Sequence, residues 1–549
     1  MEYVPARNVR FVLVVLGLVA LVGCGPASPE PVPEPDGPAV HRVVDAPDAH
    51  TVLLDAAEPA ELALTASQQV YRRAPVVVLA AETRDDDGAH LRAVHAAAAE
   101  ELEAPALLVG GSVSEHGVTD ELERLGARVA VVVVPDPSSA ADGSDDGSGA
   151  APSASATPAP ASAESAAEAA GVETVRLEVS DPLPSVETER SLPDDDAERL
   201  RADVDAALAG APTGAAPAES STLREVLALT DPQPGHEAAV ATLRAAGAVD
   251  HAVPGGDIAG SPESIERIDA AQALAVIGVG PSFGTPAEFA WRVAAAERGD
   301  LLPTGTQHLL PARYVSVAGD RRSDPADVVA EAAGTAEAYA GLDGGPVVPT
   351  VVVQASAAAG HPTEDGDWVA EEPAAELEPL VDAAREAGQY VLLDVGAGTG
   401  ALVEEIEPYE DLLARPGVGV ALHPEGRRSD GVNPPGQVSM AELRDAIAYI
   451  EGVVTNHGLP PAMVVVHQTR PESVVDRAQL GRAAAGAAVE VVVTADRTGA
   501  MTATDWVWGR VTDDLPDGVH TGWSGPSLVP YQTPDLVPTD PAPLLVAGS

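Results

Sequence analysis

Several polar side chains stand directly after apolar, β-branched runs in the C-terminal half of this chain. They are Gln354, Asp394, His423, Glu425, His467, Gln468 and Asp496. Carboxylates and imidazoles at strand ends can exchange protons with a ligand, and two carboxylates flanking a sugar linkage can hydrolyse it. The catalytic set that we predict is Glu425, Asp394, Asp496 and His467. The ligand-binding set is Gln354, His423, Gln468 and Trp523. The alternative is that these polar side chains only cap the solvated ends of the strands and neither catalyse a reaction nor bind a ligand.

The elements that must position these residues form a regular series between residues 312 and 523. Buried-strand runs occur at 312–319, 346–356, 389–396, 417–424, 462–468 and 489–496, and a last strand is expected at 518–523. Amphipathic helices such as 374–388 and 439–458 lie between them. Six or more such repeats predict a (β/α) barrel or an incomplete one, with its site at the C-terminal strand ends. Residues 311–549 are therefore predicted to form a barrel-like domain with a Pro-rich tail.

The preceding chain alternates short strand runs with alanine-rich helices, which is typical of parallel α/β units. Residues 42–135 are expected to form one such unit and 172–310 a second one with an acidic insert. In the helix expected at 89–102, His90 and His95 are placed on the solvent side. Residues 136–171 carry no periodic apolar pattern and are predicted to be a disordered linker. The fold class is thus α/β throughout.

The first unit resembles the cell wall-binding repeat 2 family. The features that carry this resemblance fall at 76–79, 96–99, 104–108 and 121–126, which hold a strand, an alanine-rich helix, a second strand and a Glu-Leu-x-x-Leu-Gly helix end. The C-terminal half resembles an uncharacterised actinobacterial family with a barrel-like domain. That family usually has Asp-Pro-Glu-Trp where this chain has His423, Pro424, Glu425 and Gly426. The resemblance implies a cell wall polysaccharide as partner.

The first 24 residues are typical of a lipoprotein signal peptide. Arg7 and Arg10 precede an apolar run at 11–22 that is too short to span a bilayer. Residues 21–24 resemble the bacterial lipobox and end at Cys24, the only cysteine in the chain. We therefore expect acylation of Cys24, which would anchor the protein to the outer face of the cell membrane. Residues 25–41 would form a Pro-rich stalk.

Composition excludes one class of partner. The chain holds 85 acidic and 31 basic residues, a net charge of −54, so nucleic acid is not expected to bind. Such acidity is consistent with life in salt. No metal site and no cofactor are predicted, although a loop with His361, Glu364, Asp365 and Asp367 offers oxygen ligands for calcium. A solvated acidic loop is the competing interpretation.

Three functions follow from these observations. The first is a membrane-anchored, surface-exposed lipoprotein that binds the cell wall or supports the envelope. The second is an exported enzyme similar to glycoside hydrolases, with carboxylates at the barrel mouth. The third rests on the run VLLDVGAGTG at 391–400, which matches the glycine-rich motif of S-adenosylmethionine-dependent methyltransferases. An exported protein has no ready supply of that cofactor, which counts against the third interpretation.

Overall fold

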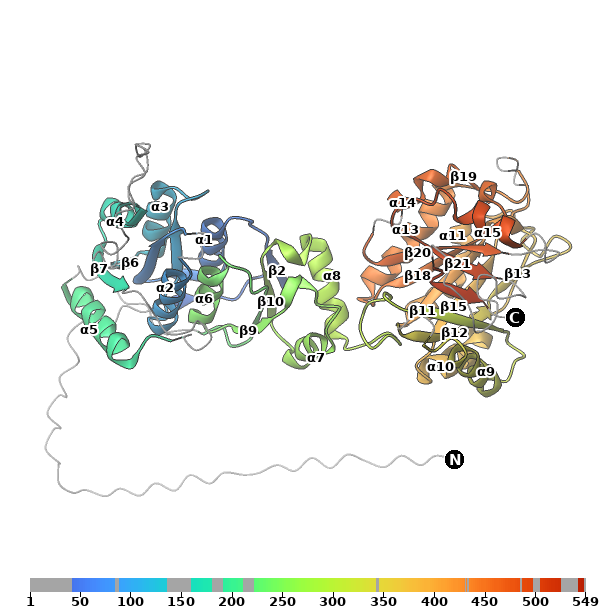
Figure 1. The fold of residues 1–549 in the computed structure, drawn as a ribbon, viewed down its shortest axis with the longest axis horizontal. Helices are drawn as coiled ribbons and strands as arrows, with labels where there is room; N and C mark the ends of the chain where they lie inside the picture. The colour runs from blue at the N-terminus through green and yellow to red at the C-terminus, as the bar shows by residue number, and fades with distance from the viewer. Residues whose placement is uncertain are drawn as a thin grey trace, which may run out of the picture.

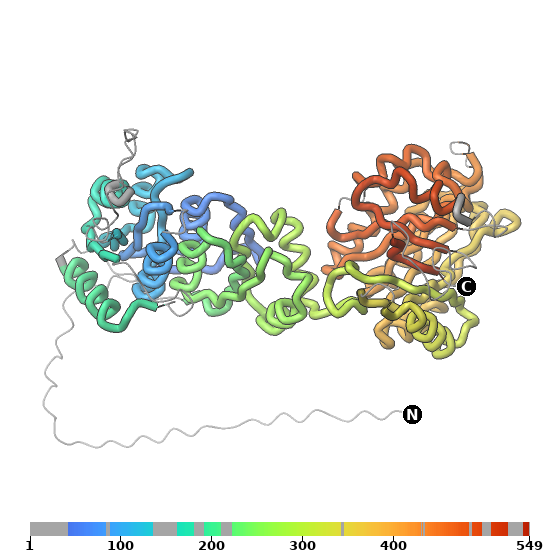
Figure 2. The backbone as a smooth tube through the Cα atoms, viewed as in Figure 1, coloured from blue at the N-terminus to red at the C-terminus, as the bar shows by residue number. Residues whose placement is uncertain are grey.

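A computed structural model describes residues 42–83, 88–135, 159–179, 191–210, 222–341, 345–429, 431, 434–483, 486–496, 504–524 and 542–547. The expected signal peptide, Cys24, the stalk and most of the Pro-rich tail lie outside these ranges. The described chain forms two lobes, and it passes from the first to the second between α8 (Pro286–Glu297) and β11 (Arg313–Gly319), as the tube in Figure 2 shows. The first lobe holds two parallel sheets and the second a closed parallel barrel (Figure 1), which confirms the predicted α/β class.

The first sheet of the N-terminal lobe has the order β5-β4-β6-β7. Its strands are β4 (Val76–Ala81), β5 (Ala106–Val109), β6 (Val129–Pro135) and β7 (Glu173–Val179). Helices α3 (Glu115–Leu125) and α4 (Ala159–Ala169) pack against each other beside this sheet, and α5 (Asp194–Gly210) packs against β6 and β7. A small antiparallel pair joins β1 (Val43–Val44) to β3 (Tyr71–Arg73). The nearly continuous apolar runs of β4, β5 and β6 fit a parallel sheet that is covered on both faces, whereas β7 at the edge is partly exposed.

The second sheet has the order β2-β10-β8-β9. Its strands are β2 (Thr51–Leu54), β8 (Val226–Thr230), β9 (Val249–Ala252) and β10 (Ala275–Val279). Helices α7 (Pro262–Ala271) and α8 contact each other, and α8 packs against β2. Phe289 of α8 lies with Ile265 and Ile268 of α7 in the apolar cluster beside this sheet. Since β2 precedes the whole first sheet in the sequence and β8, β9 and β10 follow it, this second sheet is built from two distant parts of the chain.

Three expectations about the division of the N-terminal lobe into units and a linker were wrong. Strand β2, placed in the first unit, pairs with β10 of the second sheet, and β7, placed in the second unit, pairs with β6 of the first. Backbone pairing at a sheet edge does not depend on side-chain identity, so a strand pattern does not reveal which sheet it joins. Part of the predicted disordered linker also folds, because α4 buries Ala163, Ala166 and Ala167. The remainder of that linker lies outside the described residues.

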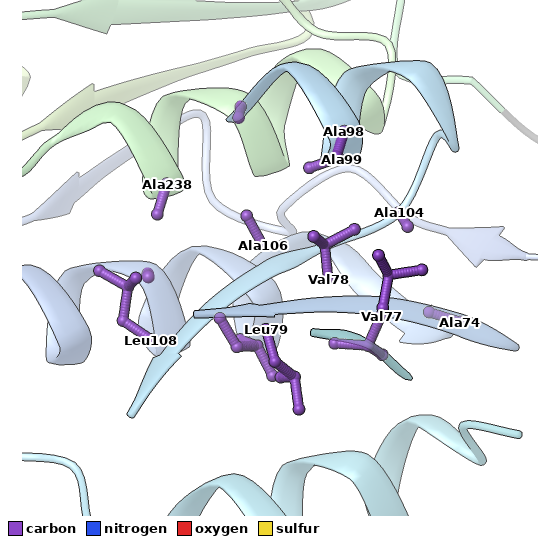
Figure 3. Packing of buried hydrophobic residues seen from close by; sticks show 14 of the residues in the cluster. Ala74, Val77, Val78, Leu79, Ala98, Ala99, Ala104, Ala106, Leu108 and Ala238 are labelled. Carbon is purple, nitrogen blue, oxygen red and sulfur yellow. The ribbon is translucent and has the colours of Figure 1, made fainter. Parts of the chain in front are cut away.

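A layer of three helices fills the space between the two sheets. Helices α1 (Pro59–Val70) and α6 (Glu237–Ala245) contact strands of both sheets, and α2 (Ala89–Glu101) packs on α6. Figure 3 shows Ala98 and Ala99 of α2 and Ala238 of α6 around Val78 and Ala106 of the first sheet. Small side chains let the helices approach closely, and one buried cluster consequently runs through both sheets.

His95 is buried within this layer, contrary to the expectation that it faces solvent. Its ring is 1% exposed, and Nε2 lies 3.2 Å from the carbonyl oxygen of Val78. Burial lowers the pKa of His95 to about 4, although hydrogen bonds to backbone carbonyls oppose the shift. The alanines that follow His95 gave no cue to the buried face, because alanine suits either face of a helix.

The second lobe is a barrel of eight parallel strands in the order β11-β12-β15-β16-β18-β20-β21-β22. Its strands are β11, β12 (Val347–Gln354), β15 (Tyr390–Gly396), β16 (Val418–His423), β18 (Ala462–Gln468), β20 (Val489–Asp496), β21 (Val519–Ser524) and β22 (Leu545–Ala547). The surrounding helices are α9 (Pro325–Glu337), α10 (Ala374–Glu386), α11 (Leu402–Ile406), α12 (Glu410–Leu413), α13 (Met440–Asn456), α14 (Leu480–Ala483) and α15 (Thr504–Thr512). The predicted barrel is confirmed, and the short β22 was missed.

Alternate residues of each strand point into the barrel. Tyr314 and Tyr390 meet edge to face inside it, with ring centroids 5.2 Å apart. The Tyr390 hydroxyl accepts a hydrogen bond of 2.8 Å from the Met463 backbone nitrogen. Gly419 makes room for this contact, since a Cβ there would lie 2.8 Å from the Tyr390 hydroxyl and 2.4 Å from the Met463 carbonyl oxygen. The interior is therefore a packed core, and the mouth alone is left for a site.

Candidate functional site at the barrel mouth

Four ionisable side chains meet at the C-terminal ends of adjacent strands. Asp394, His423, His467 and Asp496 stand on β15, β16, β18 and β20, each an even number of residues after an interior side chain such as Tyr390 or Met463. Side chains two residues apart share a strand face, so these four follow the interior rows to the mouth. Gln354 has the same parity on β12 but is exposed. The mouth thus gathers residues from the predicted catalytic and ligand-binding sets.

His423 is held between two carboxylates. Its Nε2 contacts Oδ1 of Asp394, and its Nδ1 lies 2.7 Å from Oε1 of Glu425. Glu425 belongs to the short 3₁₀ turn η6 (Pro424–Gly426), which follows β16 directly. The ring of His423 stacks on that of His467, with centroids 4.2 Å apart and planes 10° from parallel. Paired on both nitrogens, the ring of His423 cannot turn.

The electrostatics of the mouth favour an ionised His423. Burial by itself would lower the pKa of His423, but Asp394 and Glu425 outweigh it and hold that pKa well above its ordinary value. Burial would likewise raise the pKa of Asp394 and of Asp496. The neighbouring histidines prevail, so the pKa of each aspartate lies below its ordinary value. The mouth therefore holds an imidazolium among ionised carboxylates.

Two buried polar atoms beside His423 have no hydrogen-bond partner among the described residues. They are Oε2 of Glu425 and Nδ1 of His467. His467 Nδ1 lies 3.7 Å from Oδ2 of Asp496, which is too long for a hydrogen bond. Buried polar groups are normally paired, so such atoms call for a ligand, a water molecule or an ion. Both residues contact the ring of His423, so the unpaired atoms belong to the same site.

The mouth also offers donors for a metal ion. One donor atom from each of His423, His467 and Asp496 lies within 4.8 Å of the others. Two imidazoles and a carboxylate are ligands that zinc and other first-row ions accept. Both nitrogens of His423 already face carboxylates, so this residue would have to exchange a partner to bind an ion. This donor set was not predicted, because its members are far apart in sequence.

Two predicted ligand-binding residues do not reach the mouth. Gln468 follows His467 directly and points to the opposite face of β18, where its Oε1 accepts a 3.1 Å hydrogen bond from Arg477. Trp523 is fully buried between barrel and helices, where it meets Trp508 edge to face at 6.0 Å. Consecutive strand residues face opposite sides, so His467 and Gln468 cannot both enter the barrel. Strand parity was the sequence signal that would have separated them.

The glycine-rich run at 391–400 serves close packing in the barrel. Strand β15 lies between β12 and β16 of the closed barrel and not in the open sheet that the methyltransferase motif requires. A Cβ on Gly398 would stand 2.2 Å from the carbonyl oxygen of Asp367 and 2.5 Å from Val369. Glycine at 398 therefore allows a neighbouring loop to lie on the strand end, and the methyltransferase interpretation was wrong about the fold.

A second group of carboxylates lies beside the mouth. Asp365, Asp367 and Glu371 each offer a ligand atom within 4.8 Å of the other two. Glu405 of α11 is 3% exposed, and burial together with Asp367 and Glu371 raises its pKa to about 8. Sequence reasoning named Asp365 and Asp367 but missed Glu371 and Glu405, since these come from other elements. His361 and Glu364 of the same loop are exposed.

Comparisons with known proteins add little. No family model matches the chain, and no curated protein matches it. Among solved structures, Cwp6 from Clostridium difficile aligns over 65% of this chain and 66% of its own, just under two thirds of that protein's length. The identity is 12% and the TM-score 0.27, too low to carry an argument about function. Within the described residues, no helix has the length and apolar character needed to cross a membrane.

Proposed function

We propose that the barrel hydrolyses a glycan of the cell envelope by acid–base catalysis at its mouth. One observation carries this proposal. Glu425 Oε2 and His467 Nδ1, two buried atoms without a hydrogen-bond partner among the described residues, lie beside a fixed and charged His423. In this reaction Glu425 accepts a proton from the attacking water at Oε2. As the glycosidic bond breaks, the water oxygen bonds to the anomeric carbon and His467 gives the proton on its Nδ1 to the leaving-group oxygen, while Asp394 holds the ring of His423.

We propose a glycosidic bond as the substrate because its hydrolysis suits a site with paired carboxylates. Such enzymes place two carboxyl groups on either side of the bond, and the mouth holds Glu425 beside His423 and Asp496 near His467. The net charge of −54 argues against anionic polymers as substrates, because a like-charged chain would be repelled. A neutral wall polysaccharide is the substrate class that these features support.

The test is release of reducing ends from purified wall polysaccharide by the full chain. Glu425→Gln and His467→Asn should each lower the rate by about 10²-fold or more, the usual contribution of an acid–base group. Glu386→Gln on the exposed side of α10 is the matched control and should leave the rate unchanged. Equal rates in the wild-type chain and the Glu425→Gln variant, or no rate in either, would overturn the hydrolase proposal.

Metal-assisted hydrolysis is a second candidate, supported by the donor atoms of His423, His467 and Asp496 within 4.8 Å. A bound ion would supply an activated water at neutral pH. If this candidate holds, treatment with a chelator abolishes the rate and zinc or manganese restores it. Activity that survives exhaustive chelation favours the metal-free reaction.

We also propose that the protein acts at the outer face of the cell membrane, held there by acyl chains on Cys24. This proposal is supported by the leader and the lipobox-like residues 21–24. Mass spectrometry of the native N-terminus should find residue 24 first and acylated. An unprocessed start, or an unmodified Cys24, contradicts the anchoring.

Wall binding by the N-terminal lobe remains a separate proposal, which rests on the resemblance of residues 42–135 to cell wall-binding repeats. The full chain should sediment with isolated cell walls both with and without divalent cations. Failure to sediment under either condition would remove this proposal and leave the barrel chemistry unaffected.

A further inference from the structure

An irregular hairpin covers one side of the barrel mouth. Strands β13 (Ser356–Ala358) and β14 (Val369–Glu371) pair antiparallel, and the loop between them reaches the segment that follows β15. There the Thr399 backbone nitrogen donates a 2.8 Å hydrogen bond to the carbonyl oxygen of Asp367. Because Gly398 has no side chain, the loop backbone lies directly on this segment. The position of Asp367 is therefore set by the barrel itself.

The hairpin aligns its carboxylates by internal hydrogen bonds. Thr363 donates through its hydroxyl to Oδ1 of Asp365 at 2.8 Å and to Oδ1 of Asp367 at 2.5 Å. The backbone nitrogen of Val369 also donates to Oδ1 of Asp367, at 2.9 Å. These bonds use one oxygen of each aspartate. Ligand atoms of Asp365, Asp367 and Glu371 thus come within 4.8 Å of one another.

The observation that points to a ligand comes from a different element. Glu405 on α11 is 3% exposed and lies beside Asp367 and Glu371. Its Oε1 has no hydrogen-bond partner among the described residues. A buried carboxylate oxygen without a donor, next to two further carboxylates, is costly to keep ionised unless a cation neutralises the group.

The nearby guanidinium groups donate hydrogen bonds to partners outside this group of carboxylates. Arg427 is almost completely buried and donates to the carbonyl oxygens of Gly398 and Gly400 and to Glu442. Arg428 stacks on the Trp368 ring at 4.8 Å and donates to the carbonyl oxygen of Ala359. The charge of Arg427 acts on Glu405, but Arg427 also pairs with Glu442, so the four carboxylates Asp365, Asp367, Glu371 and Glu405 keep an excess of negative charge.

We propose that Asp365, Asp367, Glu371 and Glu405 bind a divalent cation of the calcium class, which clamps the hairpin to α11 at the rim of the barrel mouth. All four donors are carboxylate oxygens, which calcium prefers, and they come from an irregular loop, a strand and a helix, as suits its flexible coordination. The site lacks the imidazoles that would favour a transition metal. This inference is independent of the hydrolase proposal.

Trp368 provides a direct probe, because it adjoins Asp367 and can transfer excitation energy to a bound terbium ion. Terbium added to the full chain at physiological ionic strength should give sensitised emission. Calcium should displace the terbium and so remove this emission, whereas magnesium should displace it only poorly. Trp368→Phe should abolish the emission while the rise in unfolding temperature caused by calcium persists. This pair of measurements separates binding at the hairpin from binding elsewhere on the acidic surface.

Two variants and one control decide the assignment. Glu405→Gln and Asp365→Asn should each weaken calcium binding at least tenfold. Asp365 is exposed, so its replacement tests the site without risk to the core. Glu364→Gln, an exposed carboxylate in the same loop, is the matched control and should bind as the wild type does. Equal affinity in Glu405→Gln, Asp365→Asn and wild type, or no calcium-dependent rise in unfolding temperature, overturns the proposal.

Discussion

At the scale of single residues, the barrel mouth depends on charge compensation around His423. Asp394 and Glu425 engage its two nitrogens, and His467 covers one face of the ring. The imidazolium therefore offsets two carboxylates that are partly removed from water. Removing one member of such a group leaves the remaining charges uncompensated. The resulting loss of folding free energy is larger than the net stabilisation that the intact group contributes.

His423→Gln should therefore destabilise the barrel by about 3 kcal/mol at neutral pH, because Asp394 and Glu425 would face each other without a cation. Chemical unfolding followed by circular dichroism measures this loss. His457→Gln, an exposed histidine after α13, is the control and should cost nothing measurable. A His423→Gln variant as stable as that control contradicts the charge arrangement described above.

His95 makes the N-terminal lobe sensitive to acid. Its pKa is about 4 in the folded state against an ordinary value of 6.5, so the unfolded chain binds the extra proton. The stability contributed by neutral His95 is complete above pH 6.5 and is lost as the pH falls towards 4. At pH 5 the loss relative to pH 7.5 should be about 2 kcal/mol. His95→Leu should remove this part of the pH dependence, as followed by thermal unfolding at both pH values.

The carboxylates of this acidic chain also titrate, so the wild-type slope alone does not isolate His95. His90→Leu, at the start of the same helix, is the comparison. If both variants keep the wild-type difference between pH 7.5 and pH 5, His95 is not the neutral group in the core.

At the scale of elements, the barrel is closed by three residues from the end of the chain. Strand β22 pairs with β11 on one side and with β21 on the other. Leu545 points into the interior, and Val546 packs outward against Tyr339 and Val315. Without β22 two strands would expose unpaired backbone groups. A segment this short has no recognisable strand pattern, and only the gap between β21 and β11 determines its place.

Val546→Asp should open this seam. A carboxylate at position 546 would be removed from water among Val315, Ala336 and Tyr339, and the expected cost is about 3 kcal/mol or more. Thermal unfolding of the full chain measures it. Val475→Asp, at a valine that is 40% exposed, is the matched control and should have little effect. Similar unfolding temperatures for the two variants would mean that β22 does not hold the barrel closed.

At the scale of the whole molecule, the two lobes are joined by direct contacts as well as by the chain. The indole nitrogen of Trp291 on α8 donates a 2.9 Å hydrogen bond to the carbonyl oxygen of Leu459 in the barrel. Gly458 lies against Ala294 of the same helix, since a Cβ at 458 would be 3.2 Å from the Ala294 carbonyl oxygen. Helix α8 thus belongs to the core of the first lobe and to the interface with the second.

The charge of −54 acts on both lobes together. Its self-repulsion is screened over about 10 Å at 0.1 M salt and about 3 Å at 1 M, so added sodium chloride should raise the unfolding temperature. Most of the rise should occur below about 0.5 M, where screening changes most. A temperature that does not rise, or that rises in constant proportion up to several molar, would show that charge repulsion does not limit stability.

The amino-acid pattern was sufficient to predict the α/β class, the barrel and the strand ends that carry Asp394, His423, His467 and Asp496. Long runs of buried valine and leucine mark parallel strands, and chain order brings their C-terminal ends together. Parity along each strand would also have excluded Gln468 and Trp523. The tertiary structure alone decided which sheet accepts β2 and β7, that His95 is buried, that β22 closes the barrel and that Glu405 joins Asp367. Each of these outcomes depends on which surface remains uncovered once the other elements have packed, and no local pattern encodes that.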